Sequence, residues 1–121
     1  MTSTDERIES ARQLYGRWIN ELWAGQPVAH ELVADDFVGH WPDREVHGPD
    51  ELASIIDKTR SMLADLRFVI EVEPIVEGDR LAARWIGTGA TPDGPKRFIG
   101  NDILKFADGR VVEYWAGTSE G

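Results

Sequence analysis

The second half of the chain alternates between apolar and polar residues with a period of two, in four successive runs. The runs cover residues 67–77, 80–91, 98–106 and 110–116, and turns at 78–79, 91–95 and 108–109 separate them. Successive side chains of a β-strand point to opposite faces of a sheet, so this period indicates strands. Short turns between neighbouring strands predict three consecutive hairpins, and therefore an antiparallel sheet.

The first half of the chain has helical periodicity instead. We expect helices over residues 5–24, 28–34 and 49–64, a short strand over 35–42, a polar connector or short hairpin over 42–49, and a frayed tail over 117–121. Gly25 and Pro27 end the first helix, and Pro49 suits the start of the third. Helices followed by hairpins predict an α+β fold, in which helices cover one face of a curved antiparallel sheet.

Length, charge and residue usage narrow the class of protein. A chain of 121 residues fits one domain, 1–121, with one core. The net charge of −9 and the scattered basic residues argue against nucleic acid and anionic membranes as partners. No apolar run is long enough to span a membrane, and residues 1–7 lack the pattern of a signal peptide. The absence of cysteine excludes disulfides and thiol catalysis, and it fits a cytoplasmic protein.

One carboxylate lies in the middle of an otherwise apolar strand face. The face that carries Asp102 also carries Phe98, Gly100, Leu104 and Phe106. Burial raises the pKa of a carboxyl group, which can then exchange a proton nearer to neutral pH. Asp102 is therefore the predicted acid/base residue. The alternative is a structural aspartate that pairs with an arginine or with a buried tryptophan N–H.

Aromatic residues are the predicted lining of a pocket around Asp102. Five tryptophans in 121 residues suit a flat apolar or aromatic ligand, although core packing explains any single one as well. The predicted substrate-binding residues are Trp18, Trp41, Tyr15, Arg84, Trp85, Phe98 and Trp115.

Other polar residues are candidates to assist Asp102. His40 is the predicted second catalytic residue, because the pKa of histidine is ordinarily near neutral; the alternative is a histidine bonded to backbone. Arg84 is expected to reach Asp102 from a neighbouring strand. Tyr15, Tyr114 and Glu113 are further polar candidates. Glu113 shares a face with Val111 and Trp115 by alternation, so it is a candidate to point inward as well. The acidic and histidine residues over 40–47 fit no metal-ligand pattern, and no glycine-rich loop precedes a helix, so we expect neither metal nor cofactor.

Four motifs follow one another in a fixed order. They are Asp-Asp-Phe-Val-x-His-x-Pro at 35–42, Gly-Pro-x-x-Leu at 48–52, Gly-Asp-Arg-Leu-Ala-Ala-Arg-Trp at 78–85, and Phe-x-Gly-x-Asp-Ile-x-x-Phe-x-Asp-Gly-Arg-Val-Val-Glu-Tyr-Trp at 98–115. From about Glu6 to Trp115, the chain resembles the nuclear transport factor 2-like superfamily, and within it the SnoaL-like polyketide cyclases.

The resemblance implies a cone-shaped sheet with an internal pocket, and a homodimer formed through the outer sheet face. In the SnoaL-like cyclases, the aspartate of the Gly-x-Asp-Ile strand acts as acid/base in an aldol ring closure without a cofactor. Asp102 occupies that position. In the related ketosteroid isomerases, the general base and the oxyanion tyrosine match Trp41 and Trp18, so both isomerase groups are missing and Asp102 is expected to act almost alone.

The sequence thus favours a cofactor-independent cyclase- or isomerase-type enzyme that acts on a small apolar or aromatic molecule through Asp102. Three alternatives stay open. One is a pocket that binds a hydrophobic ligand without chemistry. Another is an epoxide-hydrolase-like enzyme that uses Asp102 and Arg84, since limonene epoxide hydrolases of this fold use an Asp-Arg-Asp set. The last is a dimeric scaffold with a filled core.

Overall fold

The computed structural model describes residues 4–121. Two predictions include residues 1–3, namely the single domain over 1–121 and the lack of a signal-peptide pattern over 1–7. Residues 1–3 lie outside the described residues. In chain order, the elements are α1 (Thr4–Arg17), the π-helix η1 (Trp18–Leu22), α2 (Ala29–Leu32), β1 (Val33–Trp41), β2 (Arg44–His47), α3 (Gly48–Met62), β3 (Ala64–Glu77), β4 (Arg80–Thr91), β5 (Gly94–Ala107) and β6 (Arg110–Glu120).

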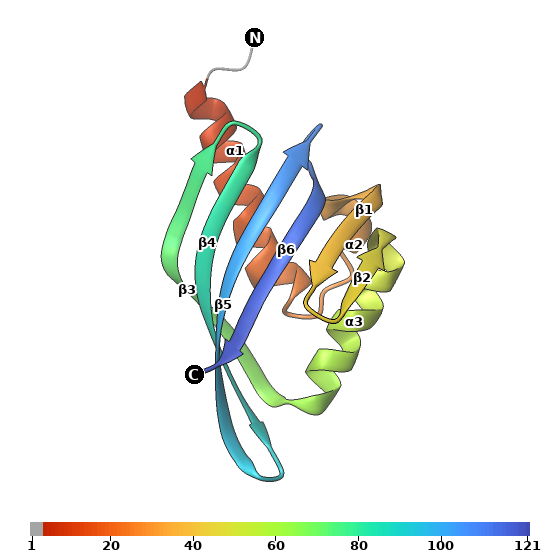
Figure 1. Cartoon of the computed structure of the whole chain (residues 1–121), viewed down its shortest axis with the longest axis vertical. Helices are drawn as coiled ribbons and strands as arrows, with labels where there is room; N and C mark the ends of the chain where they lie inside the picture. Colours follow the sequence, from red (N-terminus) through yellow and green to blue (C-terminus); the bar gives the residue numbers. More distant parts are fainter. Residues whose placement is uncertain (1–3) are drawn as a thin grey trace.

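The six strands form one curved, open sheet in the order β2-β1-β6-β5-β4-β3. Figure 1 shows α1 and α3 on the same side of this sheet, so the predicted α+β class is confirmed. The three predicted hairpins are present, because β3 to β6 pair antiparallel in sequence order. The sheet is mixed rather than purely antiparallel, since β1 runs parallel to β6. The short hairpin considered for the polar stretch over 42–49 is present, because this stretch contains β2, which pairs antiparallel with β1.

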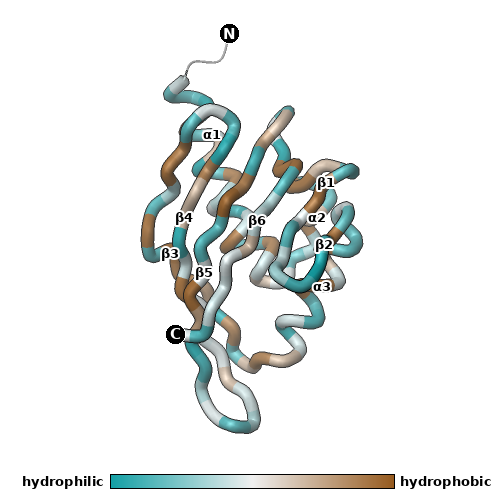
Figure 2. The backbone as a smooth tube through the Cα atoms, viewed as in Figure 1, coloured by the Kyte–Doolittle hydropathy of each residue, from teal (hydrophilic) through white to brown (hydrophobic). Residues whose placement is uncertain are grey.

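The core lies between the helices and the concave face of the sheet. Helical spacing places Ala11, Tyr15, Trp18, Ile19 and Leu22 on one buried side of the first two helical segments. The strands bury alternate residues against them, and short hydrophobic and hydrophilic segments alternate along β3 to β5 in Figure 2. Each fully buried large apolar side chain contributes about 1.5–3 kcal/mol, so this inner layer dominates the stability of the fold.

The C-terminal residues are ordered strand, so the predicted frayed tail is wrong. β6 pairs with β5 as far as Phe98 opposite Glu120, and the N–H of Gly121 donates to the carbonyl oxygen of Arg97 at 2.9 Å. β5 begins at Gly94, earlier than the sequence period indicated. Its extra residues offer backbone groups that hold the end of the chain.

The convex face of the sheet exposes apolar side chains. Val69, Ile75 and Ile103 are 64 %, 66 % and 46 % exposed there. Within residues 4–121, no helix has both the length and the apolar character that crossing a membrane would require.

Candidate functional site

A pocket of about 310 Å³ lies between the concave face of the sheet and the helices. Its walls come from η1 and the residue after it, the end of α3, and five of the six strands. The lining residues are Trp18, Ile19, Trp23, Trp41, Thr59, Met62, Leu63, Leu66, Phe68, Trp85, Phe98, Asp102, Tyr114 and Thr118. Nearly all of these side chains are apolar or aromatic, and Asp102 is the one carboxylate among them.

Asp102 lies in the middle of β5 and is 1 % exposed. Tyr15 of α1 donates its hydroxyl hydrogen to Oδ2 at 2.9 Å, and Tyr114 of β6 donates to Oδ1 at 2.7 Å. The indole of Trp85, from β4, lies beside the carboxylate and contributes to lowering its pKa. Two separate elements, α1 and β6, therefore supply one hydrogen-bond donor each, and the carboxyl group is fixed in position.

Burial has the largest effect on the pKa of Asp102. It raises this pKa, while the hydrogen bonds from Tyr114, Trp85 and Tyr15 lower it; the net direction is upward from 3.8. Burial and the nearby Asp102 charge also raise the pKa values of Tyr15 and Tyr114. Both tyrosines therefore stay protonated donors, and the aspartate holds a proton at higher pH than an exposed aspartate does.

The position of Trp85 depends on Gly100. The two residues are paired across β4 and β5, and the Trp85 ring lies directly over the Gly100 backbone. A methyl group on Gly100 would overlap the Cε2, Cζ2 and Nε1 atoms of Trp85. The glycine therefore makes room for the indole beside Asp102.

A π-helical turn brings two other indoles to the pocket. The N–H of Trp23 donates to the carbonyl oxygen of Trp18 at 3.1 Å, which is the i to i+5 bond of a π-helix. In an α-helix, residues five apart point about 140° apart. The wider turn reduces this angle, and both side chains line the pocket. The continuous helix predicted over 5–24 is therefore an α-helix as far as Arg17 and a π-helix over Trp18–Leu22, where it reaches the pocket.

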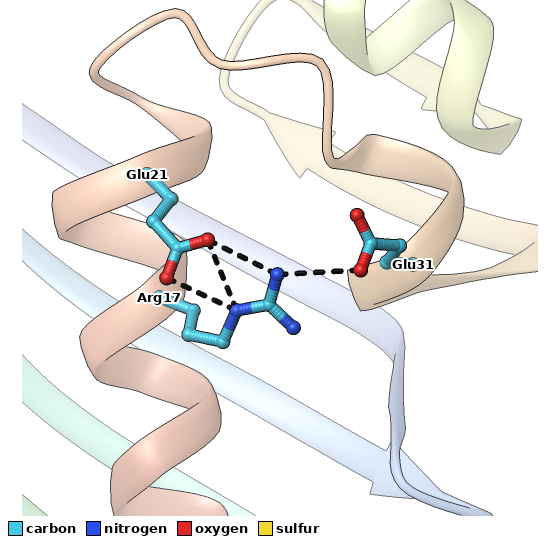
Figure 3. A network of polar contacts seen from close by, with 3 residues as sticks. All are labelled: Arg17, Glu21 and Glu31. Atoms are coloured by element: carbon cyan, nitrogen blue, oxygen red, sulfur yellow. Dashed lines mark hydrogen bonds and ion pairs between the residues drawn. The ribbon is translucent and has the colours of Figure 1, made fainter.

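Polar contacts hold this π-turn from outside. The guanidinium of Arg17 donates from Nε and Nη2 to the Glu21 carboxylate at 3.0–3.1 Å, and Nη2 lies 3.4 Å from Oε1 of Glu31 in α2 (Figure 3). At the other end, Nη1 of Arg60 in α3 donates to the carbonyl oxygen of Trp23 at 3.0 Å. The turn is thus tied to both neighbouring helices.

Five of the predicted site residues line the pocket: Asp102, Trp18, Trp41, Trp85 and Phe98. Tyr15 is fully buried behind Asp102 and contacts its carboxylate rather than the pocket.

Two other predicted site residues, His40 and Trp115, lie on the convex side of the sheet, where their rings stack with centroids 5.6 Å apart. Nε2 of His40 lies 2.6 Å from Oε2 of Glu113, and Nδ1 lies 3.3 Å from Oε2 of Glu45. The sheet separates His40 from the pocket, so the function proposed below does not use it.

Arg84 also points to the convex side. Its Nε donates to Oε1 of Glu71 at 2.7 Å, and its strand partner is Asn101 rather than Asp102. The expected pair between Arg84 and Asp102 does not form. This removes the arginine that the epoxide-hydrolase alternative requires.

A β-bulge corrects the expected orientation of Glu113. Phe106 pairs with Val111, but Lys105 pairs with Glu113, so Val112 is an extra residue in β6. An extra residue moves every following side chain to the other face. Glu113 therefore points outward with Lys105, and Tyr114 points inward to Asp102. Asp102 was expected to act almost alone, but Tyr15 and Tyr114, which were both among the polar candidates, donate to its carboxylate.

Sequence reasoning also missed part of the pocket wall. Trp23 was not among the predicted lining residues, and the pocket wall formed by Met62, Leu63 and Leu66 was not anticipated. The only signal for this wall was the apolar run at the end of the predicted helix over 49–64. Within residues 4–121, no group of three or more histidine, aspartate or glutamate side chains is placed to hold a metal ion.

The family model of the SnoaL-like domain matches residues 15–114. A proposed SnoaL-like polyketide cyclase from Jannaschia sp. CCS1 superposes with a TM-score of 0.82 and 22 % identity, over 92 % of this chain and 86 % of its own. TsrD from Streptomyces laurentii gives 0.79 and 21 %, over 92 % and 89 %. An NTF2-like protein of unknown function from Exiguobacterium sp. 255-15 gives 0.66 and 22 %, over 93 % and 97 %. No curated protein matches the chain.

Proposed function

We propose that this chain, which belongs to the SnoaL-like domain family, binds a small apolar or aromatic molecule in its pocket and moves a proton on that molecule through Asp102. One observation carries the proposal. Asp102 is the one buried charged residue among residues 4–121, and it lies in the wall of an otherwise apolar pocket. A buried carboxylate is costly for a fold, and its raised pKa suits it to acid/base work.

The size of the pocket sets the size of the ligand. An apolar cavity of about 150 Å³ holds one benzene molecule. A pocket of about 310 Å³ therefore has room for about two fused rings. The indoles of Trp18, Trp41 and Trp85 supply flat faces for such rings.

The proposed chemistry is proton abstraction beside a carbonyl group. The Asp102 carboxylate takes a proton from the carbon next to the carbonyl, the electrons of the broken C–H bond form a carbon–carbon double bond, and the negative charge moves to oxygen. Return of the proton to another carbon gives an isomer. Attack of the enolate carbon on a second carbonyl closes a ring, and Asp102 then gives its proton to the new alkoxide.

A simple two-ring ketone tests the proposal. β-Tetralone in heavy water is expected to quench the tryptophan fluorescence in a saturable way. The protein is also expected to speed deuterium entry at the carbon between the ring and the carbonyl, measured by mass spectrometry against a protein-free solution. Exchange at the protein-free rate would contradict the acid/base role, and a lack of saturable quenching would contradict the pocket assignment.

A binding protein without chemistry is the second candidate. It is favoured by the two hydrogen bonds to Asp102, because a carboxylate whose two oxygens both accept from buried tyrosines also serves as a structural anchor. The same experiment separates the two functions, since a binding protein gives quenching without exchange. The homodimer and the cytoplasmic location expected from the sequence stay predictions.

A further inference from the structure

The mouth of the pocket lies between the end of α3 and the end of β6. Among the lining residues, Met62 and Thr118 are the two that are exposed, and Met62 is 60 % exposed. The residues around Asp102, such as Trp85 and Tyr114, are buried instead. A ligand whose reacting carbon lies at Asp102 therefore has its other end at Met62 and Thr118.

Strand pairing places the Thr118 side chain on the same face of the sheet as Asp102. Thr118 of β6 is paired with Gly100 of β5, and Asp102 is paired with Ala116. Paired residues share a face of the sheet, and so do residues two apart in one strand, so Thr118 is the diagonal neighbour of Asp102. Diagonal neighbours are about 7–8 Å apart. One substituted ring spans the space between the two side chains.

Thr118 also carries the one hydroxyl group of the pocket wall that has no partner in residues 4–121. Three lining residues have a hydroxyl group. That of Tyr114 donates to Asp102, and that of Thr59 donates to the carbonyl oxygen of Ile55. The Thr118 hydroxyl makes no hydrogen bond to the described part of the chain, and Thr118 is exposed, so water reaches it. A polar group of a ligand can take the place of that water.

We propose that Thr118 is a specificity-determining residue whose hydroxyl group binds a second polar group of the ligand at the mouth of the pocket. The ligand is then a ketone with a hydroxyl or similar hydrogen-bonding group at the end farthest from the reacting carbon. A few fixed polar groups in an apolar pocket orient a ligand, and Asp102 and Thr118 hold its two ends. The inference rests on the proposed function, because it uses the same pocket and the same orientation toward Asp102.

A pair of ligands that differ by one hydroxyl group tests the inference. The compound 6-hydroxy-β-tetralone is β-tetralone with a hydroxyl group across the aromatic ring from the reacting carbon. Thr118→Val removes the protein hydroxyl and keeps the branched shape that suits a strand. We expect this variant to bind 6-hydroxy-β-tetralone about five-fold more weakly than wild type, as the loss of one hydrogen bond predicts, and to bind β-tetralone within about two-fold. Quenching of the tryptophan fluorescence measures both affinities.

Ser119→Ala is the matched control. Ser119 follows Thr118 in β6 and points to the opposite face of the sheet, so the loss of its hydroxyl is expected to change neither affinity. Binding of β-tetralone by Thr118→Val shows that the pocket of the variant is intact. A loss confined to 6-hydroxy-β-tetralone then supports the inference.

Two results count against the proposals, and they are distinguishable. An equal change for both ligands in Thr118→Val, or no change for either, overturns the inference and leaves the pocket assignment intact. A wild-type protein that binds neither ligand overturns the proposed function, and the inference with it.

Discussion

Replacement of Asp102 by asparagine is expected to slow deuterium exchange into β-tetralone by at least about 100-fold, within the range that general acid/base groups supply. The amide has the shape of the carboxyl group, but it neither takes up nor releases a proton at ordinary pH. Its oxygen still accepts from Tyr114, and its NH₂ group donates to the Tyr15 hydroxyl oxygen, which becomes the acceptor. Asp102→Asn is therefore expected to fold and to quench with β-tetralone like wild type.

The matched control for this variant is Asp36→Asn. Asp36 is exposed on β1 and does not line the pocket, so the same chemical change there is expected to leave exchange at the wild-type rate. A folded Asp102→Asn protein that exchanges β-tetralone as fast as Asp36→Asn would remove Asp102 from the mechanism. The pocket would then be assigned to binding alone.

Replacement of Gly100 by alanine is expected to lower the free energy of unfolding by about 3 kcal/mol. The added methyl group occupies the space of the Trp85 ring, and overpacking of a core costs about 1–3 kcal/mol. The displaced indole also moves away from the Asp102 carboxylate, whose pKa it lowers. Urea unfolding followed by circular dichroism measures the change.

Gly16→Ala is the control, and its expected effect has the opposite sign. Gly16 lies in α1, and a methyl group there meets no other atom within 4 Å. Alanine in a helix is more stable than glycine by about 0.5–1 kcal/mol. If Gly100→Ala unfolds at the urea concentration of wild type, the Trp85 ring is not fixed over Gly100, and the account of how Asp102 is held is wrong.

Local periodicity was enough to predict most of the architecture. The period of two gave the last four strands, and helical spacing gave α1 and α3. The parallel pairing of β1 with β6 was not predicted, because it joins segments about 75 residues apart and alternation alone carries no information on partners. The tail was missed for a related reason. Its small residues have weak strand preference, and only the length of β5 decides that they pair.

The site was predicted only in part because two backbone irregularities interrupt the local period. They are the β-bulge at Val112 and the π-turn Trp18–Leu22. Alternation correctly placed Phe98, Gly100 and Asp102 on one face of β5. The extra residue at Val112 then exchanged the faces of Glu113 and Tyr114. A single additional residue leaves the sequence pattern almost unchanged, although it reverses every orientation that follows.

The donors to Asp102 depend on contacts that a linear pattern does not contain. Tyr15 is 87 residues from Asp102 in the chain. Its hydroxyl reaches the carboxylate because α1 crosses the concave face of the sheet (Figure 1). The π-turn after α1 could not be predicted from the pattern either, because the apolar spacing over 5–24 is compatible with an unbroken α-helix.

The central claim is that Asp102 is a proton-holding carboxyl group in contact with a ligand pocket. The most direct test follows the carbon-13 resonance of the Asp102 carboxyl group across pH, with and without β-tetralone. We expect a pKa above 3.8 in the free protein and a change in this titration when β-tetralone binds, because the ligand changes the polarity of the pocket beside the carboxyl group. A pKa at or below 3.8 that β-tetralone leaves unchanged would contradict the account.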